Sequence, residues 1–418
     1  MNETQSIQWS RNDYSRVPNS VYHDPLLYEL EQKRIFEGPV WMYMGLEVEI
    51  ANPGDFRTTY LGVNPVVYNR DAQGTVHAFV NLCAHRGAIV RRELCGNAQD
   101  HVCVYHQWCY DPTGALVGVP FARGIDGKGG VSKEFRREDH ALRKLRVESF
   151  CGILFATFSD ETVPLTEYLG PVMAAHLTRL MHGKVRIIGY QRQKMRGNWK
   201  AYAENSRDQY HGSLLHKFLG TFFTKTTTLG GLHMDARHRH SLVYSTPAKT
   251  FDAPLATKAD LVHNVDSLAD ERVLRFIPEF GPDYEYGNAI CSFFPNAVFQ
   301  QIRNNLATRQ IRPKGTDSFE LLWTIFGFED DNDEMRKHRL MQMNLGGPAG
   351  FVASEDGEAI ELVHKATKDR RDTVSLLEMG GTGPLPEFAP TRMNELALRG
   401  FWSAYSELMG TEPPNAIR

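Results

Sequence analysis

Two short segments, CAHRG at 83–87 and CVYHQWCYDPTG at 103–114, constrain the fold more than any other part of the chain. They contain Cys83-x-His85 and Cys103-x-x-His106, so each offers one thiolate and one imidazole. Two thiolates and two imidazoles can hold a zinc ion or a [2Fe–2S] cluster. Zinc fingers usually place like ligands together, whereas mixed pairs suit two irons, with the cysteines on one and the histidines on the other. A structural zinc loop, or unrelated core residues, is the alternative.

The overall composition indicates a soluble globular protein. Six cysteines in 418 residues are too few for a disulfide framework, and the polar start MNETQSIQWS does not resemble a signal peptide. We find no apolar run of about 18 residues, so we expect a cytoplasmic protein without a membrane span. The net charge of −3 predicts no strong attraction to nucleic acid or anionic membranes. Ordinary thiols are expected at Cys95, Cys109, Cys151 and Cys291.

The length and the changing pattern along the chain predict two domains. Residues 40–158 read as short strands separated by turns, with a hairpin signal at 71–74, and predict a small antiparallel domain. Residues 1–39 and 159–418 predict an α+β domain, an antiparallel sheet with helices packed on it. Its expected helices are 21–38, 164–183, a long amphipathic helix from Asn198, 332–345, 354–369 and 393–410. Its expected strands are 185–195, 239–246, 287–312 and 317–328.

A second candidate metal site lies in DQYHGSLLH, residues 208–216. His211 and His216 are five residues apart, which leaves them roughly 140° apart around a regular helix. Gly212 indicates that the helix bends here. Two histidines and one carboxylate form the facial triad of non-haem Fe(II) oxygenases, whose ligands must converge from different directions. A bent helix can present this pair.

The chain resembles the large (α) subunit of the Rieske ring-hydroxylating oxygenases over almost its full length. Within that family it is most similar to the oxygenases of aromatic carboxylates, the terephthalate, salicylate and anthranilate enzymes. The matching stretches are CAHRG, CVYHQW, GNWKAYAENSRDQYHGSLLH, RQIRPKG and GPAGFVASEDGE. The resemblance implies a Rieske β domain, which holds the [2Fe–2S] cluster, and a helix-grip catalytic domain, which holds a mononuclear Fe(II).

The resemblance also implies roles for individual residues. His211 and His216 would be iron ligands, and the third would be the second member of the acidic pair Glu355-Asp356. Adjacent helical residues point about 100° apart, so only one of the two can reach the iron. Asp208 would connect an iron-bound histidine to a histidine of the cluster on a neighbouring subunit; a solvated helix face is the alternative reading. Asn205 is a weaker candidate for the iron pocket.

Other histidines and aromatic residues are assigned no role. We expect His233, His238 and His240 to be surface or core residues, and Trp199 to be core packing. The chain has no convincing GxGxxG in a strand–helix unit, so the nicotinamide site is expected on another protein. By resemblance, electrons come from NADH through a flavin reductase, with or without a ferredoxin. The resemblance also implies a trimer, the usual assembly of the family, and the sequence leaves open whether a small β subunit joins it.

The substrate prediction rests on arginine residues. Arginine suits carboxylate recognition because it binds in bidentate fashion. If residues 298–313 form one strand, Arg309 shares a mainly apolar face with Phe299, and Arg303 has the same parity. Terephthalate-type enzymes carry arginine in the ATRQ context and a second one where this chain has Arg392, which salicylate-type enzymes lack. Two arginines predict two carboxylates, hence an aromatic dicarboxylate such as terephthalate, and the resemblance implies cis-dihydroxylation of its ring.

The alternatives are a monohydroxylase of salicylate or anthranilate type, or, in another class, a non-oxygenase Rieske electron carrier or zinc protein. The alternative to substrate binding is a structural role for Arg309 and a solvated position for Arg392.

Overall fold

The computed structural model describes residues 7–216, 230–246, 270–280 and 286–417. The chain divides into two compact units: a smaller one, residues 36–165, and a larger one, residues 1–35 and 166–418. In the part of the chain that the structure describes, no helix is long and apolar enough to cross a membrane.

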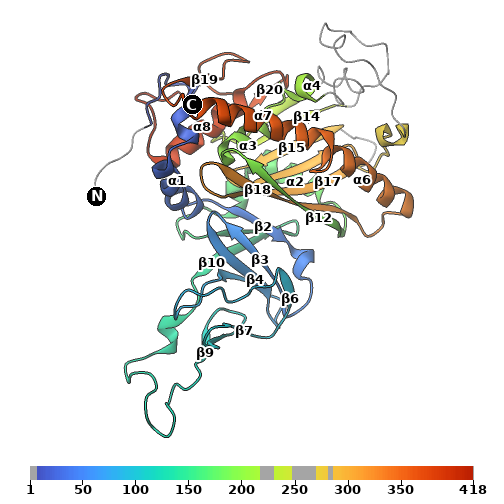
Figure 1. The fold of residues 1–418 in the computed structure, drawn as a ribbon. Coiled ribbons are helices and arrows are strands. Elements are labelled where there is room, and N and C mark those ends of the chain that lie inside the picture. Colours follow the sequence, from blue (N-terminus) through green and yellow to red (C-terminus); the bar gives the residue numbers. More distant parts are fainter. Residues whose placement is uncertain (1–6, 217–229, 247–269, 281–285, 418) are drawn as a thin grey trace. The chain divides into compact units, whose positions relative to one another are not determined.

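The smaller unit is an antiparallel β structure (Figure 1). Its main sheet has the order β2-β11-β10-β5-β4-β3-β6, and β7-β8-β9 form a second sheet. The hairpin predicted at 71–74 is confirmed, since the Asp71 N–H donates to the Thr75 carbonyl (2.9 Å) and Gly74 adopts a φ of 86°. The strands are β2 (Met42–Leu46), β3 (Asp55–Leu61), β4 (Asn64–Arg70), β5 (Val76–Val80), β6 (Cys95–Asn97), β7 (His101–Val102), β8 (Cys109–Tyr110), β9 (Leu116–Gly118), β10 (Lys144–Phe150) and β11 (Ile153–Thr157), with helical turns at η3 (Glu47–Ile50) and η4 (Arg137–His140).

The larger unit is built on an antiparallel sheet with the order β12-β18-β17-β16-β15-β14-β13-β20, beside a β1-β19 pair. The α+β prediction is therefore confirmed. The strands are β1 (Arg16–Pro18), β12 (Val185–Arg196), β13 (Gly231–Met234), β14 (Ser241–Ser245), β15 (Asn288–Phe293), β16 (Ala297–Ile302), β17 (Asn305–Pro313), β18 (Ser318–Phe328), β19 (Val374–Leu376) and β20 (Phe388–Ala389).

Helices pack on this sheet, and α3 lies against α7, α8 and β17 (Figure 1). Polar caps set where two of them begin: the Asn198 side chain accepts from the Lys200 N–H (3.1 Å) at α3, and Asn332 accepts from the Met335 N–H (2.9 Å) at α6. The helices are η1 (Asn19–Tyr22), α1 (Pro25–Glu31), the π-helix η2 (Gln32–Phe36), α2 (Leu165–Leu180), α3 (Trp199–Asn205), α4 (Gly212–Leu215), η7 (Glu271–Leu274), α6 (Asp333–Gly346), α7 (Phe351–Thr367) and α8 (Leu396–Met409).

A buried polar cluster fixes α3 in the core. The Glu31 carboxylate accepts hydrogen bonds from Trp199 Nε1 (2.7 Å), Lys200 Nζ (2.5 Å) and the Tyr405 hydroxyl (2.7 Å). All four side chains are almost completely buried. Trp199 is thus a core residue, as predicted, and it helps to position the segment that leads to His211.

The predicted long helix from Asn198 is wrong, because α3 ends at Asn205 and α4 begins at Gly212. The cause is Asp208, whose Oδ1 accepts from the N–H groups of Tyr210 (2.8 Å) and His211 (3.4 Å). A short acidic side chain that bonds to nearby backbone offers the chain an alternative to helix.

The predicted single strand over 298–313 is also wrong. β16 and β17 form a hairpin, with Ile302 opposite Asn305 and Arg303 in the left-handed region at φ 53°. The turn changes which residues share a face. Arg309 lies opposite Val298, whereas Phe299 pairs with Thr308 on the other face. Arg303 therefore belongs to the turn rather than to the strand.

Candidate metal centres and active site

The two cysteine–histidine segments of the smaller unit fold into matching turns. The Cys83 N–H donates to the Ala88 carbonyl (2.8 Å), and the Cys103 N–H donates to Trp108 (2.9 Å). Gly87 and Gln107 each return a hydrogen bond to the first carbonyl of their turn, and both have positive φ, 71° and 55°. In the sequence, glycine at position 87 indicates a left-handed backbone conformation, whereas glutamine at position 107 gives no such indication.

The four side chains form two separate pairs. Cys83 and Cys103 are buried and interact with each other, while the His85 and His106 rings lie 4.5 Å apart between centroids. Among these four, no three ligand atoms all lie within 4.8 Å of one another. Ligands of one tetrahedral zinc ion would meet that limit, since their bonds measure about 2.0–2.3 Å. The arrangement fits a two-iron cluster and disfavours a single zinc ion.

Neighbouring aromatic residues support the two pairs. The Trp108 ring stacks on His85 with 4.8 Å between centroids and an interplanar angle of 7°. The Tyr110 hydroxyl lies 3.2 Å from Cys83 Sγ and accepts from the Ala84 N–H (3.0 Å). Hydrogen bonds to cluster sulfurs tune reduction potentials, so Tyr110 is placed to affect the potential.

Purified protein is expected to be red-brown, with two irons and two acid-labile sulfides per chain besides the mononuclear iron. His106→Cys should lower the potential of any cluster it keeps, because thiolate replaces neutral imidazole. Metal analysis, sulfide assay and redox titration check both expectations. Colourless protein with one zinc per chain would contradict the cluster.

In the larger unit, His211 and His216 flank the four-residue helix α4, with His211 at its N-cap and His216 at its C-cap. His216 leaves the helix with ψ 97°, so the pair converges through two helix ends rather than through a bend. Asp356 Oδ1 lies 3.3 Å from Nε2 of both histidines. Ligand atoms of the three residues all lie within 4.8 Å of one another, which fits one metal ion.

The other nitrogen of each imidazole faces a second carboxylate. His211 Nδ1 is 3.0 Å from Asp208 Oδ2, and His216 Nδ1 is 2.9 Å from Glu355 Oε2. A carboxylate at one ring nitrogen fixes the tautomer and leaves the other nitrogen's lone pair for a metal. Glu355, the member of the acidic pair that is not expected to bind iron, thus contacts a histidine. Asn205 Nδ2 donates to Asp356 Oδ1 (3.0 Å).

The carboxylates and imidazoles of this site shift one another's pKa values. Burial alone would lower the pKa of His211, but Asp208 and Asp356 outweigh it and raise that pKa to about 9. Burial alone would raise the pKa of Asp356, but the two imidazoles hold that pKa far below its usual value. The carboxylates around the two imidazoles therefore favour positive charge at this site, which suits a metal cation.

A cavity opens from these three residues, and three arginines line it: Arg303, Arg309 and Arg392. Apolar lining comes from Val273, Ile290, Ile302, Leu345 and Val352. A cavity with mainly apolar walls and a few convergent polar groups is the usual form of a small-molecule site. The structure therefore brings together the predicted iron-binding and substrate-binding residues.

Arg309 is held in place by neutral groups. Its guanidinium donates to the Tyr202 hydroxyl (2.8 Å) and to Gln300 Oε1, and it lies 4.2 Å above the Trp323 ring. Arg392 is 9% exposed, and its Nε is buried without a hydrogen bond. Burial lowers the pKa of Arg392 to about 10. Neither guanidinium forms an ion pair with a carboxylate among the residues that the structure describes.

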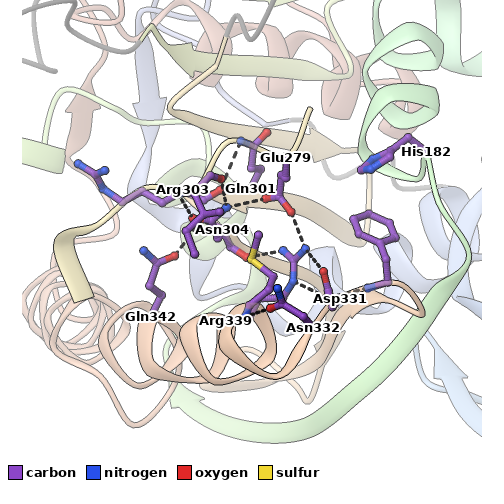
Figure 2. Close-up of polar contacts among 12 residues, drawn as sticks. His182, Glu279, Gln301, Arg303, Asn304, Asp331, Asn332, Arg339 and Gln342 are labelled. Carbon is purple, nitrogen blue, oxygen red and sulfur yellow. Dashed lines mark hydrogen bonds and ion pairs between the residues drawn. The ribbon is translucent and has the colours of Figure 1, made fainter. Parts of the chain in front are cut away.

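A buried network holds the turn that carries Arg303 (Figure 2). Arg339 pairs with Glu279 (2.5 Å) and Asp331 (2.8 Å) and donates to the Asn304 carbonyl (2.7 Å). Gln342 of α6 accepts from the Asn304 N–H (2.9 Å) and also lines the cavity. The wall containing Arg303 is therefore fixed from α6.

Comparison with known proteins identifies a domain family in each of the two units. The model of the Rieske [2Fe-2S] domain matches residues 40–132, and that of the ring hydroxylating alpha subunit (catalytic domain) matches residues 182–411. The chain is 43% identical to the anthranilate 1,2-dioxygenase large subunit of Burkholderia cepacia, covering 98% of this chain and 96% of that protein. The chain belongs to the Rieske ring-hydroxylating oxygenases. As an oxygenase of this family, it uses a Rieske [2Fe–2S] cluster and a mononuclear iron.

Other relatives of this Rieske oxygenase have different named substrates. It is 41% identical to the alpha 2 subunit of terephthalate 1,2-dioxygenase from Comamonas sp (97% and 98% covered). It is 40% identical to the large component of salicylate 5-hydroxylase from Ralstonia sp (97% of each). Naphthalene 1,2-dioxygenase from Rhodococcus sp. bound to indole shares the fold, with a TM-score of 0.79 at 24% identity over 96% of this chain and 95% of that one.

Proposed function

We propose that this Rieske oxygenase cis-dihydroxylates an aromatic dicarboxylate of terephthalate type. The observation that carries the proposal is the presence of Arg309 and Arg392 in the wall of one cavity, without a carboxylate partner among the described residues. A buried cation without a counter-charge costs free energy, which a bound carboxylate offsets. Two such cations in one cavity favour a substrate with two carboxylates.

The side chains would share the work as follows. Arg309, held by Tyr202 and Gln300, would bind one carboxylate in a fixed orientation, and Arg392 would bind the second. The apolar wall would pack against the ring and exclude water. The iron would be held by His211, His216 and Asp356, and when bound it supplies activation of O₂. The cluster, which supplies electrons, would be held by Cys83, His85, Cys103 and His106.

A second candidate is an anthranilate- or salicylate-type oxygenase that acts on a ring with one carboxylate. The specific observation in its favour is identity, because relatives named for anthranilate, terephthalate and salicylate are almost equally similar, at 43%, 41% and 40%. In that case Arg309 would bind the single carboxylate, and Arg392 would face the amino or hydroxyl substituent.

The electron donor is proposed to be a separate NADH-dependent flavin reductase, acting directly or through a ferredoxin. The assembly is proposed to be a trimer, alone or with a small β subunit. A ring of heterologous contacts can bring the cluster of one subunit to the iron of the next. Asp208, which is partly exposed beside His211, would then connect the two centres.

Product analysis tests the substrate. The enzyme with a reconstituted reductase is supplied in parallel with terephthalate, phthalate, benzoate, salicylate and anthranilate, and products are identified by mass spectrometry. We expect a cis-dihydrodiol from terephthalate at the highest kcat/KM. Equal turnover of benzoate, or hydroxylation of salicylate or anthranilate in preference to terephthalate, would establish the second candidate instead.

A further inference from the structure

A second group of metal-ligating side chains lies in the larger unit, away from the iron site. His23 follows η1, Asp317 lies between β17 and β18, and His364 lies near the C-terminal end of α7. Ligand atoms of these residues all lie within 4.8 Å of one another. His364 is eight residues beyond Asp356 on the same helix, or about 12 Å along its axis, so the two groups are distinct.

The hydrogen bonds of His23 leave one of its ring nitrogens with a free lone pair. The Thr367 hydroxyl donates to the Val363 carbonyl (2.9 Å), so its oxygen accepts from His23 Nε2–H (2.9 Å). Nδ1 then carries no proton, and it is buried without a hydrogen bond within the described part of the chain. His23 is 4% exposed. A histidine that donates one N–H to a fixed acceptor and offers the other nitrogen is arranged as metal ligands are.

The other two side chains complete a mixed donor set. His364 Nε2 lies 3.0 Å from Asp317 Oδ1, and the His23 and His364 rings are 4.4 Å apart between centroids. The Asp317 side chain is 61% exposed, which gives an ion and its water a path to the group. Two imidazoles, one carboxylate and a water form a common four-coordinate set for zinc.

We propose that His23, Asp317 and His364 bind a divalent transition-metal ion of the zinc class as a structural clamp. The clamp would join the N-terminal segment and the β17–β18 turn to the end of α7. α7 packs closely on the segment that joins β12 to α3, since a Cβ at Gly197 would lie 2.8 Å from Ile360. The same helix carries Asp356 and Glu355 at its other end, so the clamp would hold the helix that completes the iron site.

Two cations limit the affinity of this site. Lys368 Nζ lies 3.5 Å from Asp317 Oδ2, the oxygen that does not face His364, and Arg371 contributes positive charge near His23. Both reduce the attraction for a divalent ion. Removal of Lys368 should therefore strengthen metal binding, the opposite of what removal of a ligand does.

The test uses the iron-loaded holoenzyme, dialysed against Zn²⁺ and then against buffer, with zinc and iron measured by mass spectrometry and zinc affinity by chelator competition. We expect one extra zinc per chain with no loss of iron, and a higher melting temperature with zinc. Asp317→Asn and His23→Gln should weaken binding by about 100-fold or more, since even outer-shell changes cost 10–100-fold. Lys368→Ala should bind more tightly, and Asp369→Asn, an exposed control on the same segment, should bind as the native chain does.

Absence of retained zinc, or zinc retained only as iron is lost, would overturn the proposal. Equal zinc affinity in Asp317→Asn and in the native chain would also overturn it. Because Asp317 is mostly exposed, its substitution leaves the core intact and a folding defect does not obscure the result. None of these outcomes depends on which aromatic acid the enzyme oxidises.

Discussion

Product formation by Asp208→Asn is expected to fall by about 100-fold or more while both metal centres remain loaded, an effect at the upper end of what outer-shell changes cause. In the native chain His211 Nδ1 lies 3.0 Å from Asp208 Oδ2. Asparagine keeps an oxygen that can accept a hydrogen bond from this nitrogen, but it removes the negative charge. If Asp208 connects the two centres, the loss appears in electron transfer. Stopped-flow oxidation of the reduced cluster, with substrate and O₂ present, measures that step directly.

Glu355→Gln is the matched control, because Glu355 makes the equivalent contact with Nδ1 of the other histidine at 2.9 Å. Its substitution should weaken iron binding by about 10–100-fold and leave the rate of cluster oxidation in iron-saturated enzyme nearly unchanged. Complete loss of mononuclear iron from Asp208→Asn, or normal turnover, would contradict the assigned role. Equal effects of the two substitutions on iron binding and on cluster oxidation would also contradict that role.

Arg309→Met is expected to lower kcat/KM for an aromatic dicarboxylate by about 100-fold or more. Leaving a buried charge unpaired costs roughly 3–5 kcal/mol, and each 1.4 kcal/mol is about tenfold. Methionine keeps an unbranched side chain against the Trp323 ring, so that the loss reports the charge rather than a cavity. Steady-state kinetics with terephthalate and benzoate measure the effect, and melting temperature controls for stability.

Arg392→Met separates the two candidate substrates. It should lower kcat/KM for terephthalate far more than for benzoate, because only the dicarboxylate needs a second cation. If it changes neither, and benzoate is used as well as terephthalate, the dicarboxylate assignment is wrong.

The metal-site motifs could be recognised from sequence because their chemistry fixes residue type and spacing within short segments. Cys83, His85, Cys103 and His106 lie in two turns, and the fold of each unit follows from strand and helix patterns that the structure reproduces. The ends of elements were harder to predict. Asp208 interrupts the expected helix through its own side-chain hydrogen bonds, a local competition that apolar periodicity does not register.

Long-range partners could not be predicted from the sequence. The face of Arg309 was misassigned because a two-residue turn reverses the chain at Arg303 and Asn304, neither of which is glycine. The contact of Glu355 with His216, and that of Tyr202 with Arg309, join residues more than 100 positions apart. Spacing along the chain carries no information about such pairs.

In the hairpin turn, Arg303 combines a strained backbone conformation with a positive charge in the cavity wall. A left-handed arginine costs roughly 1–2 kcal/mol in conformational strain, which glycine would not incur. Arg303→Gly would therefore relax the turn while removing a positive charge from the wall of the cavity. Arg309 and Arg392 would keep their charges, so such a change would alter the charge of one wall of the cavity and leave both proposed carboxylate contacts in place.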